Sequence, residues 1–259
     1  MENKDLLVEI RKNPLMIKDI ENPSEEIQLE AIKNNAFLIQ YLENPSREIQ
    51  IEAIKRSPSA IEHIKNADDE IKKIAVRATW NVLNLIKDPS EEVIKAALEA
   101  KGWAIQYVKD ASEDLQVIAV QKDYDSIKYI ENPSERVQMA AVENQWGAIK
   151  FIKGPSLEVM RAAVKKSAEA INYIDYYDYD DIEKFVEDNI EVVKFLYESI
   201  DLDMVEAVLK EKLSSEDIDR DYIINFLELK VLEMDKLGLV KEHGSKKCKQ
   251  IVVDYKLSF

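Results

Sequence analysis

Apolar and polar positions alternate along this chain with a fixed period of 22 residues, from about residue 22 to residue 175. Each period opens on a polar triplet, the first being Asn22-Pro23-Ser24 and the last Gly154-Pro155-Ser156. Apolar residues follow at the fifth, ninth and tenth positions after the first residue of the triplet. The ninth is always alanine: Ala31, Ala53, Ala75, Ala97, Ala119, Ala141 and Ala163. Because such spacing places side chains on one face of a helix, each period predicts a first helix of about 11 residues.

A second apolar set, with members three residues apart, closes each period, as Ile39 and Leu42 do in the first. This set predicts a second helix of about 8 residues after a tight turn. The triplet indicates where helices begin: Asn or Asp as the N-cap, Pro at the first helical position, and Glu three residues after the cap to complete a capping box. Proline also disfavours helix in the residue before it, so the triplet ends the preceding helix.

Neither short helix would be stable alone, so we expect the repeats to stack and bury each other's apolar faces. The constant alanine indicates close approach of a neighbouring helix. The predicted fold is an all-α, right-handed α-solenoid of short helix pairs with a helical C-terminal cap and a tail that forms short β-strands or stays ordered. The predicted segments are an N-terminal capping half-repeat (1–21), seven repeats (22–175), a degenerate repeat with the helical cap (176–237) and the tail (238–259).

The repeat NPSEEIQLEAIKNNAFLIQYL resembles short HEAT-like repeats, whose first helix reads D-P-x-x-V-R-x-A-A. The stretches IRKNPLMIKDI and IKRSPSAIEHI also resemble leucine-rich-repeat variants. The repeat is most similar to short α-helical repeats of uncharacterised bacterial, phage and protist proteins. This resemblance implies the architecture of residues 22–175 and says almost nothing about function. The chain departs from HEAT repeats at Gln28, Gln50 and Lys72, among others, where an arginine would stand.

The formal net charge of −15 is unevenly distributed. Residues 176–221 carry 16 acidic and 5 basic side chains, a net of −11, whereas residues 222–259 carry 5 acidic and 7 basic ones, a net of +2. Direct nucleic-acid binding is disfavoured, because neutralisation of phosphates dominates such affinity. An acidic surface favours a basic or nucleic-acid-binding protein as partner, unless it serves solubility alone.

Candidate chemistry is sparse. His63 and His243 lie far apart, and there is no glycine-rich phosphate loop or nucleophile motif, so the sequence predicts no metal, no cofactor and no enzyme. The single cysteine, Cys248, excludes an internal disulfide framework. No apolar run approaches the roughly 18 residues of a membrane span and no signal peptide is recognisable, so we expect a cytoplasmic protein that does not bind membranes.

Two aromatic groups are the candidate partner-binding residues. The first falls between the two helices of a repeat: Phe37, Trp80, Trp103, Tyr124 and Trp146. Because the repeats stack, these rings should recur along one edge as a hot-spot strip, unless each ring closes the core of its own repeat. The second group replaces the triplet after the last repeat: Tyr176, Tyr177, Asp178, Tyr179, Asp180 and Asp181. It is either a site for a basic partner or a solvated junction between repeats.

A third aromatic column, which includes Tyr41, Tyr107 and Tyr129, is predicted to be half-buried beside the core. Taken together, the features favour a non-enzymatic repeat scaffold that binds a protein partner through a solenoid face or the acidic C-terminal segment. The alternative is a phage or mobile-element inhibitor of a host nucleic-acid-binding defence protein, acting by acidic mimicry or by steric block, which the distribution of similar repeats implies. The oligomeric state stays open.

Overall fold

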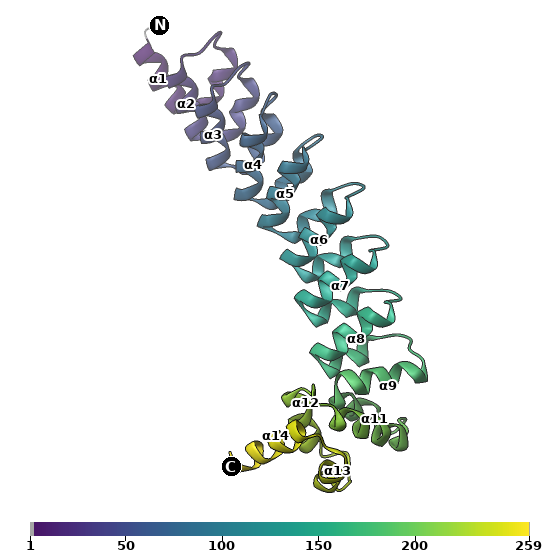
Figure 1. Cartoon of the computed structure of the whole chain (residues 1–259). Coiled ribbons are helices and arrows are strands. Elements are labelled where there is room, and N and C mark those ends of the chain that lie inside the picture. The colour runs from purple at the N-terminus through teal and green to yellow at the C-terminus, as the bar shows by residue number, and fades with distance from the viewer. Residues whose placement is uncertain (1–2, 259) are drawn as a thin grey trace. The chain divides into compact units, whose positions relative to one another are not determined.

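The computed structural model describes residues 3–258, and these residues form helices joined by turns and short loops, without a strand. The chain divides into two compact units, Met1–Glu131 and Asn132–Phe259. In each unit the α-helices of the repeats follow one another like rungs (Figure 1). The predicted all-α, solenoid-like repeat fold is therefore confirmed, and its handedness stays a prediction.

In the first unit α-helices alternate with 3-10 helices (η): α1 (Asn3–Lys12), η1 (Pro14–Asp19), α2 (Glu25–Asn34), η2 (Ala36–Tyr41), α3 (Arg47–Arg56), η3 (Pro58–His63), α4 (Asp69–Ala78), η4 (Trp80–Leu85), α5 (Glu91–Ala100), η5 (Gly102–Tyr107), α6 (Glu113–Lys122) and η6 (Tyr124–Tyr129). The second unit continues the alternation and then leaves it: α7 (Glu135–Asn144), η7 (Trp146–Phe151), α8 (Leu157–Lys166), η8 (Ala168–Tyr173), α9 (Tyr179–Asp188), η9 (Ile190–Val192), α10 (Val193–Leu196), α11 (Leu202–Ser214), α12 (Arg220–Glu228), α13 (Lys236–His243) and α14 (Lys246–Leu257).

The second helix of each repeat is a 3-10 helix of six residues, shorter and tighter than the predicted helix of about 8 residues. In η2 and its C-cap, the N–H groups of Leu38 and Leu42 donate to carbonyls three residues earlier. Side chains three residues apart eclipse one another in a 3-10 helix. The spacing of Ile39 and Leu42 therefore suits this helix, and both side chains are buried.

Serine, not asparagine, is the N-cap of the first helix, so the predicted cap position was wrong by two residues. Ser90 accepts a hydrogen bond from the N–H of Val93, and its hydroxyl donates to Asp69 of the preceding repeat at 2.6 Å. Asn22 has a φ of 49° and Asp88 one of 44°, so the first residue of these triplets turns the chain in the left-handed region. Glutamates such as Glu91 consequently stand at the first helical position, where they favour the helix dipole but form no capping box.

The core consists of the predicted apolar columns. Ile27, Ala31 and Ile32 of α2 are at most 1% exposed, and every alanine of the constant column is completely buried. Neighbouring α-helices contact one another along each unit, as α4 does α5 and α7 does α8. The alanine column therefore lies where successive helices approach most closely.

The predicted β tail is a pair of helices, α13 and α14. Ser245 caps α14 by accepting from the N–H of Cys248. Cys248, Ile251 and Val252 are buried at helical spacing, so packing of one helix face against α12 overrides the β propensity of the Ile-Val-Val run. Burial also raises the pKa of the Cys248 thiol.

Candidate interaction surfaces

The five aromatic residues predicted between the helices lie instead in the 3-10 helices, at their first or second residue. Trp80, Tyr124 and Trp146 open η4, η6 and η7, while Phe37 and Trp103 are second in η2 and η5. A single extended residue, such as Thr79 with a φ of −154°, separates the two helices of a repeat. The turn is therefore shorter than the sequence suggested, and the aromatic residues belong to a regular element.

Four of these rings pack against an aromatic side chain of the next repeat. Their ring centroids lie 5.7–6.2 Å apart in these pairs: Phe37 with His63, Trp80 with Tyr107, Trp103 with Tyr129, and Trp146 with Tyr173. The three tryptophans are half-buried, whereas Phe37 is 39% exposed. Aromatic pairs at such distances stabilise packing. The rings therefore join neighbouring repeats and at the same time present one edge to solvent.

Trp103 is held by the most extensive network of this edge. Its indole N–H donates to Asp125 at 2.6 Å, and the ammonium of Lys128 lies 2.8 Å from the same carboxylate. The Lys128 and Lys101 ammoniums lie 4.2 and 4.8 Å from the centre of the Trp103 ring. Burial raises the pKa of Asp125, but hydrogen bonds from Lys128 and Trp103 outweigh burial, so the pKa of this carboxyl falls below its ordinary value. The hydrogen bond to Asp125 in turn raises the pKa of Lys128.

The last residue of each 3-10 helix forms a surface column that we call the ridge. In the first unit the ridge is Tyr41, His63, Leu85, Tyr107 and Tyr129, and in the second it includes Phe151 and Tyr173. All of its tyrosines and Phe151 are exposed, to between 36% and 44%. Successive 3-10 helices from η1 to η6 contact one another, so the ridge of the first unit is continuous.

The prediction that this column is half-buried was wrong for its tyrosines and Phe151. The periodicity of the 3-10 helix explains the difference, because Ala36 and Ile39 turn to the core while Gln40 and Tyr41 turn away from it. Polar residues directly before each ridge residue are a sequence signal that could have revealed this exposure. They are all exposed: Gln40, Glu62, Asn84, Gln106 and Lys128 in the first unit.

The Tyr/Asp segment before α9 combines capping with exposed rings. Asp178 is the N-cap of α9 and forms a capping box with Asp181, so the cap of the repeat is kept. The Tyr177 ring packs at 5.8 Å against the buried Phe185. Tyr176 is 76% exposed and its hydroxyl donates to Asp178 at 2.7 Å, which raises the pKa of the phenol. Tyr179, half exposed, donates to Asp201 at 3.2 Å, and Asp180 lies on the exposed surface beside it. Three of the six predicted residues thus have structural roles.

An acidic cleft of about 590 Å³ lies in the second unit, beside α8, α9, α11 and α12. Six carboxylates line it, with two lysines, Lys165 and Lys212: Glu187, Asp188, Glu211, Asp217, Asp219 and Asp221. Arg161 pairs with Asp188 through two hydrogen bonds of 2.6 and 3.0 Å. Tyr222, buried at the cleft, donates to the carbonyl of Val186 at 2.9 Å. The cleft attracts cationic groups and offers no nucleophile.

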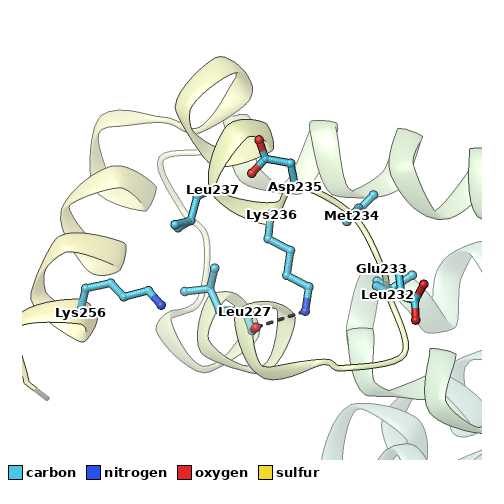
Figure 2. A pocket seen from close by; sticks show the side chains of 8 residues that line it. All are labelled: Leu227, Leu232, Glu233, Met234, Asp235, Lys236, Leu237 and Lys256. Carbon is cyan, nitrogen blue, oxygen red and sulfur yellow. Dashed lines mark hydrogen bonds between the residues drawn. The ribbon is translucent and has the colours of Figure 1, made fainter.

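A hollow of about 570 Å³ lies beside α12, α13 and α14 (Figure 2). Leu227, Leu232 and Leu237 supply its apolar lining. The ammonium of Lys236 points to the C-terminal end of α12, where it donates to the carbonyl of Leu227 at 3.1 Å and to that of Leu229. Burial lowers the pKa of Lys236. The cation therefore satisfies carbonyls left open at a helix end and stabilises the α12 dipole.

Alkaline pH is expected to destabilise the second unit through Tyr222. Burial raises the pKa of this phenol far above its ordinary value, so its stabilising effect is complete below the unfolded pKa of about 10 and is lost as the pH rises toward the folded pKa. Tyr222→Phe should cost about 1 kcal/mol of unfolding free energy at pH 8, because the hydrogen bond to Val186 is removed. Urea denaturation followed by circular dichroism at pH 8 and pH 11 measures both effects.

Between these two pH values the wild-type chain should lose more stability than Tyr222→Phe, so the gap between them should narrow or reverse. Tyr197→Phe, at an exposed position, is the matched control and should behave as the wild type does. A gap of unchanged size at pH 11 would contradict the prediction.

Within residues 3–258, no three His, Cys, Asp or Glu side chains are grouped as metal ligands would be. Among the helices that the structure describes, none combines the length and the apolarity needed to cross a bilayer. Comparisons of the chain with protein-family models, with curated proteins and with solved structures find no match. The helical repeat architecture thus rests on the chain's own period and structure, and the likeness to HEAT-like repeats stays a resemblance.

Proposed function

We propose that this chain is a non-enzymatic repeat scaffold that binds a protein partner through the ridge. The observation that carries the proposal is the exposure of Tyr41, Tyr107 and Tyr129 at equivalent positions of one continuous surface. Tyrosine is enriched among the residues that dominate binding energy in protein interfaces. Exposed aromatic rings in a row are unusual on a surface that only needs to be soluble.

The rings beneath the ridge support this proposal, because they hold it in place. Trp80 packs against Tyr107 and Trp103 packs against Tyr129, and Trp103 is itself fixed by Asp125. A binding surface that is ordered before the partner arrives pays less conformational entropy on binding. The tryptophans then act as supports for the binding residues.

The double variant Tyr107→Ala/Tyr129→Ala is expected to bind the partner at least about tenfold more weakly, because each hot-spot side chain contributes about 2 kcal/mol. The partner is first captured from native lysate on the immobilised full chain after nuclease treatment and identified by mass spectrometry. The dissociation constants of the wild type and the variant for the purified partner are then compared by calorimetry.

The matched control is Val8→Ala/Val253→Ala, which trims two apolar side chains of similar exposure away from the ridge. It should leave the dissociation constant within about twofold. Equal binding by the ridge variant and the wild type would refute the role of the ridge. Melting curves of all three proteins establish that the substitutions leave the fold intact.

A second candidate function is the inhibition of a nucleic-acid-binding protein through acidic mimicry, as a phage or mobile-element inhibitor of a host defence protein would act. The observation that favours it is the gathering of six carboxylates around the cleft of the second unit. Charge-driven binding loses affinity steeply with salt, whereas an aromatic interface does not. The same calorimetric titration, repeated from low to high salt, therefore distinguishes the two candidates.

A further inference from the structure

The spacing of the ridge gives the first indication of which protein segment fits it; this inference rests on the proposed function. One ridge side chain occurs per repeat, and the repeats are set apart by packed α-helices such as α4 and α5. Packed helices lie about 8–10 Å apart. A polyproline II helix has three residues per turn and rises about 3.1 Å per residue, so it presents equivalent side chains about every 9.3 Å. One turn of such a segment therefore matches one repeat.

The residues beside the ridge give the second indication, which is independent of spacing. Four of the five polar side chains that precede the ridge residues in the first unit carry N–H donors: Gln40, Asn84, Gln106 and Lys128. Gln40 and Gln106 each use an amide N–H on the backbone carbonyl of a residue in their own 3-10 helix, and each amide carries a second N–H. The tyrosine hydroxyls of the ridge add further donors.

A surface rich in donors suits a ligand whose backbone offers mainly acceptors. Proline lacks an N–H, and a polyproline II helix has no internal hydrogen bonds, so its carbonyls all require outside donors. The ridge and its neighbouring donor column thus complement a proline-rich backbone in both shape and hydrogen bonding. Aromatic surfaces recognise such segments in other proteins because the preformed helix loses little entropy on binding.

Other peptide conformations fit less well. Side chains on one face of a β-strand repeat about every 6.6–6.8 Å, which does not match the repeat, and residues 3–258 offer no strand edge to extend. An α-helix repeats a face after seven residues, about 10.5 Å, but its own carbonyls are already bonded internally. A helical partner would leave the donors of Gln106 and Asn84 facing no acceptor.

We propose that the ridge of the first unit binds a proline-rich segment of its partner in the polyproline II conformation, one turn per repeat. Tyr107 and Tyr129 pack against successive prolines. Gln106 donates to a carbonyl of the segment between them. The class of partner is thus a protein with an exposed proline-rich stretch of at least two or three turns.

The test titrates the full chain with a peptide of four Pro-Pro-Leu triplets flanked by lysines and with a control peptide in which every proline is alanine. Binding is followed by tryptophan fluorescence and by calorimetry, because Trp80 and Trp103 lie beneath the ridge. The proline peptide is expected to bind at least about tenfold more tightly than the control peptide, and Tyr107→Ala/Tyr129→Ala should abolish this preference. Gln106→Glu, which exchanges a donor for an acceptor on an exposed side chain, should weaken proline-peptide binding several-fold, whereas Gln106→Lys should keep it.

Equal affinity for the two peptides would overturn the inference, and so would proline-peptide binding that neither Tyr107→Ala/Tyr129→Ala nor Gln106→Glu weakens. The two proposals fail in distinguishable ways. If the captured partner still depends on the ridge while the proline peptide does not bind, the scaffold function stands and only the polyproline inference falls. If the partner binds the ridge variant as well as it binds the wild type, both fall.

Discussion

Replacing Phe185 with alanine is expected to lower the free energy of unfolding of the second unit by about 3–5 kcal/mol. Phe185 in α9 is completely buried, and it is among the largest side chains of the chain without solvent contact. It lies where the regular repeats give way to the C-terminal helices, because α9 contacts both α8 and α11. Its removal costs the transfer free energy of the ring and leaves a cavity that the two flanking helices fill only partly.

Urea denaturation monitored by circular dichroism measures this loss, and differential scanning calorimetry shows which part of the chain is affected. A domain is commonly stable by only 5–15 kcal/mol, so the transition of the second unit should move to a clearly lower temperature. Phe195→Ala is the matched control, since the Phe195 ring is 43% exposed in the same unit. The control should change stability by about 1 kcal/mol at most. Equal losses in the two variants would show that burial at α9 is not the cause.

Enlarging the constant alanine of α5 is expected to be the most damaging change in the first unit. Ala97 is completely buried, and α5 contacts both α4 and α6. Ala97→Leu adds three carbon atoms where two helices already touch, so side chains must leave their preferred rotamers or the helices must separate. Such overpacking typically costs about 1–3 kcal/mol, and here the cost should reach the upper end because both neighbours are constrained by further repeats.

Ala100→Leu is the control on the same helix, at an exposed position. Both substitutions make the same chemical change and have the same helix propensity, so the difference in their urea midpoints isolates packing. Ala100→Leu should lie within about 0.5 kcal/mol of the wild type. If Ala97→Leu were equally harmless, the alanine column could not be explained by close helix approach.

The repeat itself was predictable, because its physical cause is written at fixed spacing in the sequence. Ile27, Ala31 and Ile32 were recognised as one helix face, and they are buried as one face. The type of the second helix was less accessible. Spacing of three residues, as between Ile39 and Leu42, fits one turn of either an α-helix or a 3-10 helix. Only the extended residues on both sides, Asn35 and Leu42, limit the element to six residues.

The misplaced cap and the misassigned tail have different physical causes. Asn22 and Ser24 are both good N-caps in isolation, and the sequence does not show that Asn22 takes a left-handed turn. At the tail, the β-branched run of Ile251, Val252 and Val253 outweighed the helical spacing that begins at Cys248. Local propensity was the wrong guide there because tertiary packing on α12 decides the conformation.

The candidate surface was only partly visible in the sequence. The tryptophans were identified as a recurring edge, but their packing against Tyr107, Tyr129 and Tyr173 depends on contacts between repeats that no single repeat encodes. The exposed ridge was missed because large aromatic residues beside a core stripe ordinarily point inward. Its exposure follows from the 3-10 geometry, which the sequence did not determine.

The uniform triplet has a consequence for how this protein can change over evolutionary time. Every repeat of residues 22–175 begins alike and has the same length, so unequal recombination between two copies removes or adds a whole repeat without disturbing the frame of the helices. Because each repeat packs mainly on its nearest neighbours, the shortened or lengthened chain keeps a complete core. The ridge would then grow or shrink by one side chain at a time, and copy number becomes a stepwise control on the length of partner segment that the chain accommodates.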